Sequence, residues 1–136
     1  MVATCGGYST SGYTASCLVL DPINQRWDES RMGDLTMERY NGATATLDHI
    51  GVFIVAGIRP NNVRTSEFLA AGTMRWQKGS ALPVDMDRPC TVPITPTSFL
   101  SIHGTDIREF DAAIAGPTSR EEHNLQSPVY SHTSGF

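Results

Sequence analysis

The chain has 136 residues, 40% hydrophobic and 18% charged, a balance typical of a globular domain or of part of one. Its formal net charge of −4 and its scattered basic residues argue against nucleic acid and anionic membranes, because both partners need a clustered basic surface. No apolar run reaches the ~20 residues that span a bilayer. We therefore expect no nucleic acid and no membrane among the partners.

Short strands separated by turns are predicted along most of the chain. Thr, Val and other residues suited to a pleated surface fill them, and Gly, Pro and Asn clusters such as GGYSTSG, GIRPNN and ALPVD lie between them. Arg108–Ala115 is the nearest candidate for a helix, and it lacks a helical apolar stripe. The sequence therefore predicts an all-β fold. In chain order the expected strands are Met1–Cys5, Cys17–Leu20, Arg26–Asp28, Asn41–Leu47, Val52–Ala56, Ser66–Leu69, Arg75–Gln77, Thr91–Thr95 and Ser98–Ile102.

The chain also carries an internal repeat of about 50 residues. Trp27 and Trp76 lie 49 residues apart, and Arg39 and Arg88 are separated by the same 49 residues. A period of this length with four short strands per unit is typical of β-propeller blades. Three glycines show a similar period, because Gly7, Gly57 and Gly104 lie at intervals of 50 and 47 residues.

These markers resemble kelch repeats, in which a Gly-Gly doublet follows an apolar strand. A Tyr-Asp-like pair, a tryptophan six residues later and an arginine complete the pattern. The first repeat matches at Gly6-Gly7, Leu20-Asp21, Trp27 and Arg39, the second at Ala56-Gly57, Leu69-Ala70, Trp76 and Arg88, and the third at His103-Gly104 and Phe110-Asp111, with Pro117 in the tryptophan position.

The resemblance implies that residues 1–112 are kelch repeats of a partial β-propeller. Its blades would be four-stranded and antiparallel, with two clear blades and a degenerate third. Residues 113–136 are expected to be a degenerate or disordered tail, or alternatively to supply Tyr130–Phe136 as an innermost strand of a further blade. Three blades are too few for a ring, since propellers have about 4–8. We expect the remaining blades to be supplied in cis, by a longer protein, or in trans.

Each marker has a structural role. A glycine doublet permits positive φ where a strand turns, and it lets neighbouring backbones approach. The tryptophan is expected to fill the wedge between adjacent blades, and the arginine to bond loop carbonyls or to pair with a carboxylate between repeats. The strongest signals in this sequence therefore describe the fold rather than the function.

Three cysteines, Cys5, Cys17 and Cys90, show no paired close spacing. We expect free, buried, reduced thiols in a cytoplasmic protein, because no signal peptide is visible. A Cys5–Cys17 bridge between neighbouring strands is the alternative if the protein is secreted.

No catalytic residue, metal site or cofactor is predicted. The four histidines have no metal-ligand spacing with one another or with the cysteines, and no nucleophile elbow, phosphate-binding loop or zinc-protease motif occurs. Paired carboxylates such as Glu121-Glu122 lie in polar segments where nothing separates their pKa values. An enzymatic activity is therefore not expected.

The loops after the glycine doublets, Tyr8–Thr14 and Ile58–Arg64, hold the candidate binding residues. Ordinary solvated loop chemistry is the alternative for each of them. We predict a module that binds a protein or peptide, with an acidic or phosphorylated ligand favoured by the two arginines. The candidates are Tyr8, Tyr13, Arg59, Asn61, Asn62 and Arg64.

The resemblance to kelch proteins implies two settings for such a module. One is substrate recognition for a cullin-RING ubiquitin ligase, and the other is actin-associated scaffolding. Two alternatives stay open: an enzyme domain similar to galactose oxidase, which needs converging metal ligands, and a non-functional truncated propeller.

Overall fold

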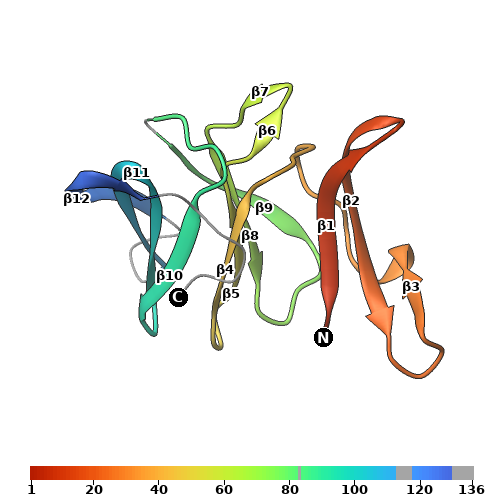
Figure 1. Ribbon diagram of the computed structural model, residues 1–136. Helices are drawn as coiled ribbons and strands as arrows, with labels where there is room; N and C mark the ends of the chain where they lie inside the picture. The colour runs from red at the N-terminus through yellow and green to blue at the C-terminus, as the bar shows by residue number, and fades with distance from the viewer. Residues whose placement is uncertain (83, 113–117, 130–136) are drawn as a thin grey trace.

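The computed structural model describes residues 1–82, 84–112 and 118–129, and nearly all of its regular structure is antiparallel β (Figure 1). The described residues contain one short 3-10 helix, η1 (Glu29–Arg31), and no α-helix. No helix among them is both long enough and apolar enough to cross a membrane. The all-β prediction is confirmed.

The first sheet is a meander of three strands in the order β1-β2-β3. A register shift between Cys5 and Gly7 interrupts the pairing of β1 with β2. Gly6 and Gly7 have φ values of +71° and +131°, which is the positive φ expected of the doublet. The strands are β1 (Ala3–Ser9), β2 (Gly12–Asp21) and β3 (Arg26–Asp28).

The second sheet has four strands in the order β4-β5-β8-β9. Phe53, Ile54 and Val55 of β5 are buried and Val52 is partly buried, in keeping with a strand of β-branched and aromatic residues. A small hairpin, β6-β7, is inserted between β5 and β8. The bounds are β4 (Ala43–Leu47), β5 (Gly51–Val55), β6 (Ile58–Arg59), β7 (Asn61–Asn62), β8 (Thr65–Ala70) and β9 (Trp76–Ala81).

The third sheet has the order β10-β11-β12, with strands β10 (Cys90–Thr95), β11 (Ser98–Asp111) and β12 (Thr118–Val129). The boundary expected at residue 112 follows the end of β11. Residues 118–129, assigned to a tail from the sequence, form β12 and pair with β11. Pro117 and the alternative innermost strand Tyr130–Phe136 lie outside the described residues.

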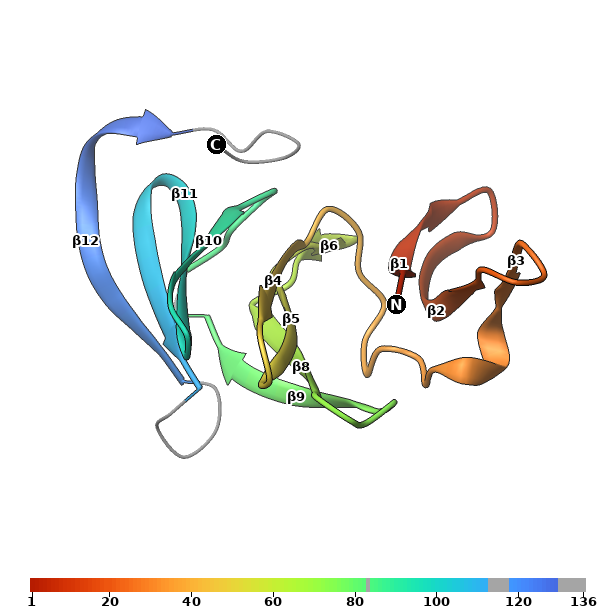
Figure 2. The ribbon, with the colours of Figure 1, turned by 90° about the horizontal axis from the view of Figure 1, so that it is seen from below.

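The three sheets lie side by side, with the second between the other two (Figure 2). They do not close into a ring. Within each sheet the strands follow one another in chain order, with the β6-β7 hairpin intervening between β5 and β8. This arrangement creates two interfaces, one on each side of the second sheet.

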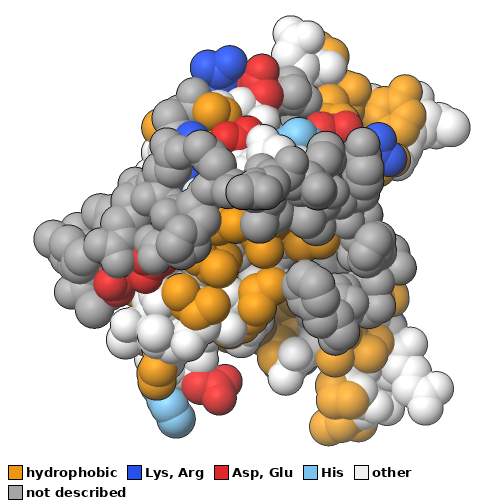
Figure 3. All heavy atoms as spheres, turned by 60° about the vertical axis from the view of Figure 1, so that its left-hand side comes forward, with side chains coloured by type: hydrophobic (Ala, Val, Ile, Leu, Met, Phe, Trp, Pro, Cys, Tyr) orange, Lys and Arg blue, Asp and Glu red, His pale blue; other side chains and the backbone are white. Residues whose placement is uncertain are grey.

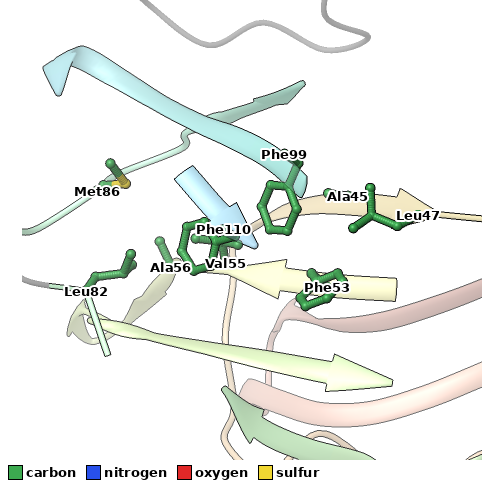
Figure 4. Packing of buried hydrophobic residues seen from close by; sticks show 9 residues of the cluster. All are labelled: Ala45, Leu47, Phe53, Val55, Ala56, Leu82, Met86, Phe99 and Phe110. Carbon is green, nitrogen blue, oxygen red and sulfur yellow. The ribbon is translucent and has the colours of Figure 1, made fainter. Parts of the chain in front are cut away.

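Aromatic packing dominates the interface between the second and third sheets (Figure 4). Phe99 and Phe110 of β11 stack with ring centroids 4.9 Å apart, and Phe53 of β5 lies 5.1 Å from Phe99. Ala45 and Leu47 of β4 complete the same cluster. Such rings combine large apolar burial with a preferred stacking geometry, so they fix the third sheet against the second.

A second cluster fills the interface between the first and second sheets. In this cluster, Cys17 and Val19 of β2 pack with side chains of the second sheet. The second-sheet members are Ile54 of β5, Leu69 of β8 and Trp76 of β9. Met32 and Leu35 contribute from the segment that connects the two sheets.

The two repeat tryptophans differ in their surroundings. Trp76 is 8% exposed and lies in the core between sheets, as predicted for a residue that fills a wedge. Trp27 is 48% exposed, so it does not fill a wedge between the described sheets. Trp27 belongs to β3, the outer strand of the first sheet, and no further sheet covers it among the described residues.

The repeat arginines differ in the same way. Arg39 is buried and donates to the backbone oxygens of Ala56 and Thr65, at 2.8 and 3.1 Å. Arg88 is exposed and its contact is with neighbouring Asp87 at 3.4 Å. The predicted role between repeats therefore holds for Arg39, whereas Arg88 contacts only its sequence neighbour among the described residues.

The cysteines also differ from the sequence prediction. Cys5 and Cys17 lie directly opposite each other on β1 and β2 and form a disulfide. The expectation of free thiols is wrong for this pair, and the alternative bridge between neighbouring strands is the one observed. Cys90 is free and buried, as expected.

Candidate functional site

Three tyrosines from separate parts of the chain meet at one end of the molecule. Tyr8 at the end of β1 contacts Tyr13 of β2, with ring centroids 5.0 Å apart and planes tilted by 59°. Its other neighbour is Tyr40, at 6.1 Å. Tyr8 is 64% exposed and Tyr40 42%, so the cluster presents aromatic surface to solvent.

The strand-and-turn geometry explains why Tyr8 and Tyr13 meet. They are opposite each other in the β1–β2 register, and only Thr10 and Ser11 separate the two strands. Side chains that face each other across an antiparallel pair lie within contact distance. The predicted loop Tyr8–Thr14 is therefore a tight hairpin, and its rigidity holds both rings.

Tyr40 is positioned by the second sheet's hairpin. Its backbone exchanges two hydrogen bonds with Ile58 of β6, at 2.7 and 3.1 Å. The β6-β7 hairpin and the β1-β2 hairpin extend from the same end of the molecule (Figure 1). Arg59 and Asn61 of the β6-β7 hairpin are exposed. We call Tyr8, Tyr13, Tyr40, Arg59 and Asn61 the aromatic face.

A buried ion pair supports the aromatic face from within. The Arg39 guanidinium lies 2.8 Å from the carboxylate of Glu67 on β8. The other carboxylate oxygen of Glu67 accepts from the backbone N–H of Thr36 at 2.6 Å. Burial lowers the pKa of the Arg39 guanidinium, and the nearby Glu67 carboxylate opposes that change. The segment before Tyr40 is therefore tied to the second sheet.

Each arginine of the candidate loop has a carboxylate partner within the chain. Arg59 pairs with Glu38, and Arg64 lies 2.5 Å from Asp85. The hydrogen bond to Asp85 raises the pKa of Arg64. Blue and red side chains accordingly lie together along the upper edge of the molecule (Figure 3). Charge on this end of the molecule is balanced rather than basic.

The structure brings together only part of the predicted set. Tyr8, Tyr13, Arg59 and Asn61 contribute to the aromatic face, whereas Arg64 follows the hairpin and pairs toward Asp85. Asn62 is placed in β7 by its backbone pairing with Ile58.

Tyr40 is the residue that sequence reasoning missed. It follows the repeat marker Arg39 and precedes Asn41, which has a φ of +60°. An aromatic residue beside a turn was the available signal. Its contact with Tyr8 depends on how two sheets pack, and no local pattern records that contact.

The described ranges contain no group of three His, Cys, Asp or Glu side chains arranged to hold a metal ion. A comparison with models of known protein families finds no match for this chain, and a comparison with curated proteins finds none either.

Proposed function

We propose that the chain is a protein–protein interaction module that binds a peptide or protein through the aromatic face. The observation that supports this proposal is the contact of the exposed Tyr8 ring with both Tyr13 and Tyr40, the last of which belongs to a different part of the chain. Tyrosine offers a large, amphipathic contact area at a small entropic cost, and it is enriched among residues that dominate binding energy.

The proposal includes a kelch-type partial propeller as the architecture. Three successive antiparallel meanders lying side by side support it. The same resemblance implies a cytoplasmic role in ubiquitin-ligase substrate recognition or actin-associated scaffolding. The Cys5–Cys17 disulfide is instead typical of proteins in oxidising compartments. The binding proposal does not depend on the compartment, because the aromatic face does not include these cysteines.

Aromatic contacts, rather than arginine charge, are expected to select the ligand. Arg59 and Arg64 already have carboxylate partners, so an acidic ligand would replace an existing pair instead of meeting an unpaired cation. Exposed pairs of this kind contribute about 0–1 kcal/mol. An acidic group therefore adds little to binding, and the tyrosines provide the anchor.

The test is a binding experiment with the whole chain as bait, followed by titration of each partner recovered. Tyr8→Ala combined with Tyr40→Ala should weaken binding by about 2 kcal/mol, roughly thirtyfold, because both anchors are removed. Ile23→Ala is the matched control, since this apolar residue is 89% exposed and lies in the β2–β3 turn.

Arg59→Ala combined with Arg64→Ala separates the two explanations of ligand choice. We expect this variant to bind within about threefold of the unchanged chain, which corresponds to less than 1 kcal/mol. A partner that binds the double tyrosine variant as tightly as the unchanged chain would show that the aromatic face is not the binding site.

A further inference from the structure

Two residues, Asn41 and Gly42, link Tyr40 of the aromatic face to β4. Tyr40 is bonded to the β6-β7 hairpin on one side of the link, and on the other side the ladder of β4 with β5 begins at Ala43. The peptide unit between Asn41 and Gly42 therefore lies outside both pairings. It is also the one place where any of the chain's five asparagines precedes a glycine.

The backbone geometry accounts for both residues of this pair. Asn41 has a φ of +60°, a left-handed conformation that asparagine adopts more readily than most residues with a side chain. A Cβ on Gly42 would lie 3.2 Å from the carbonyl oxygens of Val55 and Ala56, so a larger residue would be crowded there. The fold thus favours asparagine followed by glycine at this position, whatever the chemistry of the pair.

The groups that can react with each other in this pair are not held by hydrogen bonds to other described residues. The Gly42 N–H donates to no backbone oxygen among them, and the Asn41 side-chain amide has no partner there either. Gly42 is exposed and Asn41 is half-buried, so water reaches the link. By contrast, the side-chain amide of Asn24 donates to the Asp21 carboxylate at 2.7 Å.

We propose that Asn41 is a modification site, at which the side chain deamidates spontaneously through a succinimide. The Gly42 backbone nitrogen attacks Cγ of Asn41 and forms a new N–Cγ bond. The Cγ–Nδ2 bond breaks, and the side-chain nitrogen leaves as ammonia with the proton of the Gly42 amide. Asparagine is among the thermolabile residues, and glycine favours the attack because no Cβ shields or restricts its nitrogen.

Water then opens the ring in one of two ways. Addition at Cγ breaks the new N–Cγ bond and gives aspartate with the original main chain. Addition at the main-chain carbonyl carbon breaks the original peptide bond to Gly42 and gives isoaspartate, whose main chain runs through Cβ and Cγ. Each product carries one negative charge that Asn41 lacks.

The isoaspartate product should disturb the aromatic face. It lengthens the main chain by one carbon atom between Tyr40 and β4, and the backbone is paired on both sides of the insertion. The Tyr40 ring lies 6.1 Å from the Tyr8 ring, across the packing of two sheets. We expect the extra atom to move Tyr40 away from Tyr8. The modification itself does not depend on any ligand of the aromatic face.

The test is incubation of the whole chain at neutral and at mildly alkaline pH, followed by peptide mapping with mass spectrometry. Asn41 should convert before Asn24, Asn61 and Asn62, because a residue with a Cβ follows each of these. Conversion should be faster at the higher pH, since the nucleophile is the Gly42 nitrogen after it loses its proton. Isoaspartate among the products would show that the reaction passes through the ring.

An unstructured peptide with the same local sequence, acetyl-Arg-Tyr-Asn-Gly-Ala-Thr-amide, gives the rate of the reaction without the fold. Folding should slow the conversion by no more than about a hundredfold, because segments with few hydrogen bonds open locally at a small free-energy cost.

Two variants serve as controls, and both tolerate the left-handed conformation. Asn41→Gly removes the side chain that reacts, so it should form no acidic product at this position. Asn41→Asp carries the charge of the products without the longer main chain. NMR should show the contact between the Tyr8 and Tyr40 rings in both variants, and its loss in the isolated isoaspartate form.

Three results would overturn the inference. One is an unchanged Asn41 amide in the folded chain after about a hundred half-lives of the peptide. Another is faster conversion at Asn24, Asn61 or Asn62, because the pair with glycine would then not be the reactive one. The third is aspartate without any isoaspartate, which would mean that water attacks the side chain directly.

Discussion

Positive φ angles at single residues determine where strands of this protein turn. Gly6 and Gly7 have this conformation in the first repeat, and Ala56 and Gly57 have it in the second, with φ values of +61° and +115°. An alanine is strained there, since its Cβ disfavours the left-handed region. Ala56 is fully buried in the core between the second and third sheets, and this packing offsets the strain.

Gly6→Ala should destabilise the protein by roughly 2–4 kcal/mol, because a left-handed conformation and a clash act together. Its Cβ would lie 2.5 Å from the carbonyl oxygen of Arg39. Gly104→Ala is the matched control, since Gly104 has a φ of +59° and an added Cβ would meet no described atom within 4 Å. It should cost about 1–2 kcal/mol. Urea denaturation measures both, and equal costs would show that the Arg39 carbonyl moves aside.

At the scale of elements, the segment between the first and second sheets is held by one buried side chain. Arg39 reaches β8 and bonds Glu67, while its backbone oxygen accepts from Gly7. A buried pair of this kind need not stabilise the fold relative to apolar residues, but removal of one partner leaves an uncompensated charge. The pair therefore specifies where the connecting segment lies.

Arg39→Met should destabilise the protein by about 3–5 kcal/mol, and Glu67→Leu by a similar amount. The double variant should cost less than the sum of the two, because no unpaired charge remains. Arg88→Met serves as the control: its exposed guanidinium contacts Asp87 at 3.4 Å, so a change within about 0.5 kcal/mol is expected. Thermal or urea denaturation of the four proteins gives the cycle, and strict additivity would contradict the coupling.

At the scale of the whole molecule, two interfaces hold the three sheets together, and a tryptophan is part of the core of only one of these interfaces. Trp76 packs between the first and second sheets, whereas Trp27 has no sheet on its outer side among the described residues. Their sequence positions are equivalent and their energetic roles are not.

Trp76→Ala should destabilise the protein by roughly 3–5 kcal/mol, the usual cost of truncating a core tryptophan. Trp27→Ala should cost about 1 kcal/mol, since nearly half of the side chain is already exposed. Chemical denaturation tests the energies. Fluorescence of Trp27→Phe and Trp76→Phe tests the burial, and the chain that keeps Trp76 should emit at the shorter wavelength. Similar emission from both would contradict the difference in exposure.

Strand positions and turns could be predicted from the sequence because they depend on local patterns. Expected strands such as Arg26–Asp28 and Thr91–Thr95 match β3 and β10 to within one residue at each end. Alternating apolar residues, turn-forming glycines and β-branched residues act within a few positions of each other, and these signals survive without tertiary contacts. Tyr8, Tyr13 and Arg59, which lie in the two hairpins, were chosen as candidates on the same basis.

Tertiary structure alone decided which of these residues work together. The partnership of Arg39 with Glu67, the contact of Tyr8 with Tyr40 and the pairing of Cys5 with Cys17 each join residues from different strands or segments. The repeat made Trp27 and Trp76 equivalent, yet only one has a neighbouring sheet to cover it among the described residues. Burial and pairing depend on surfaces brought together by folding, and those surfaces are absent from any local stretch of the sequence.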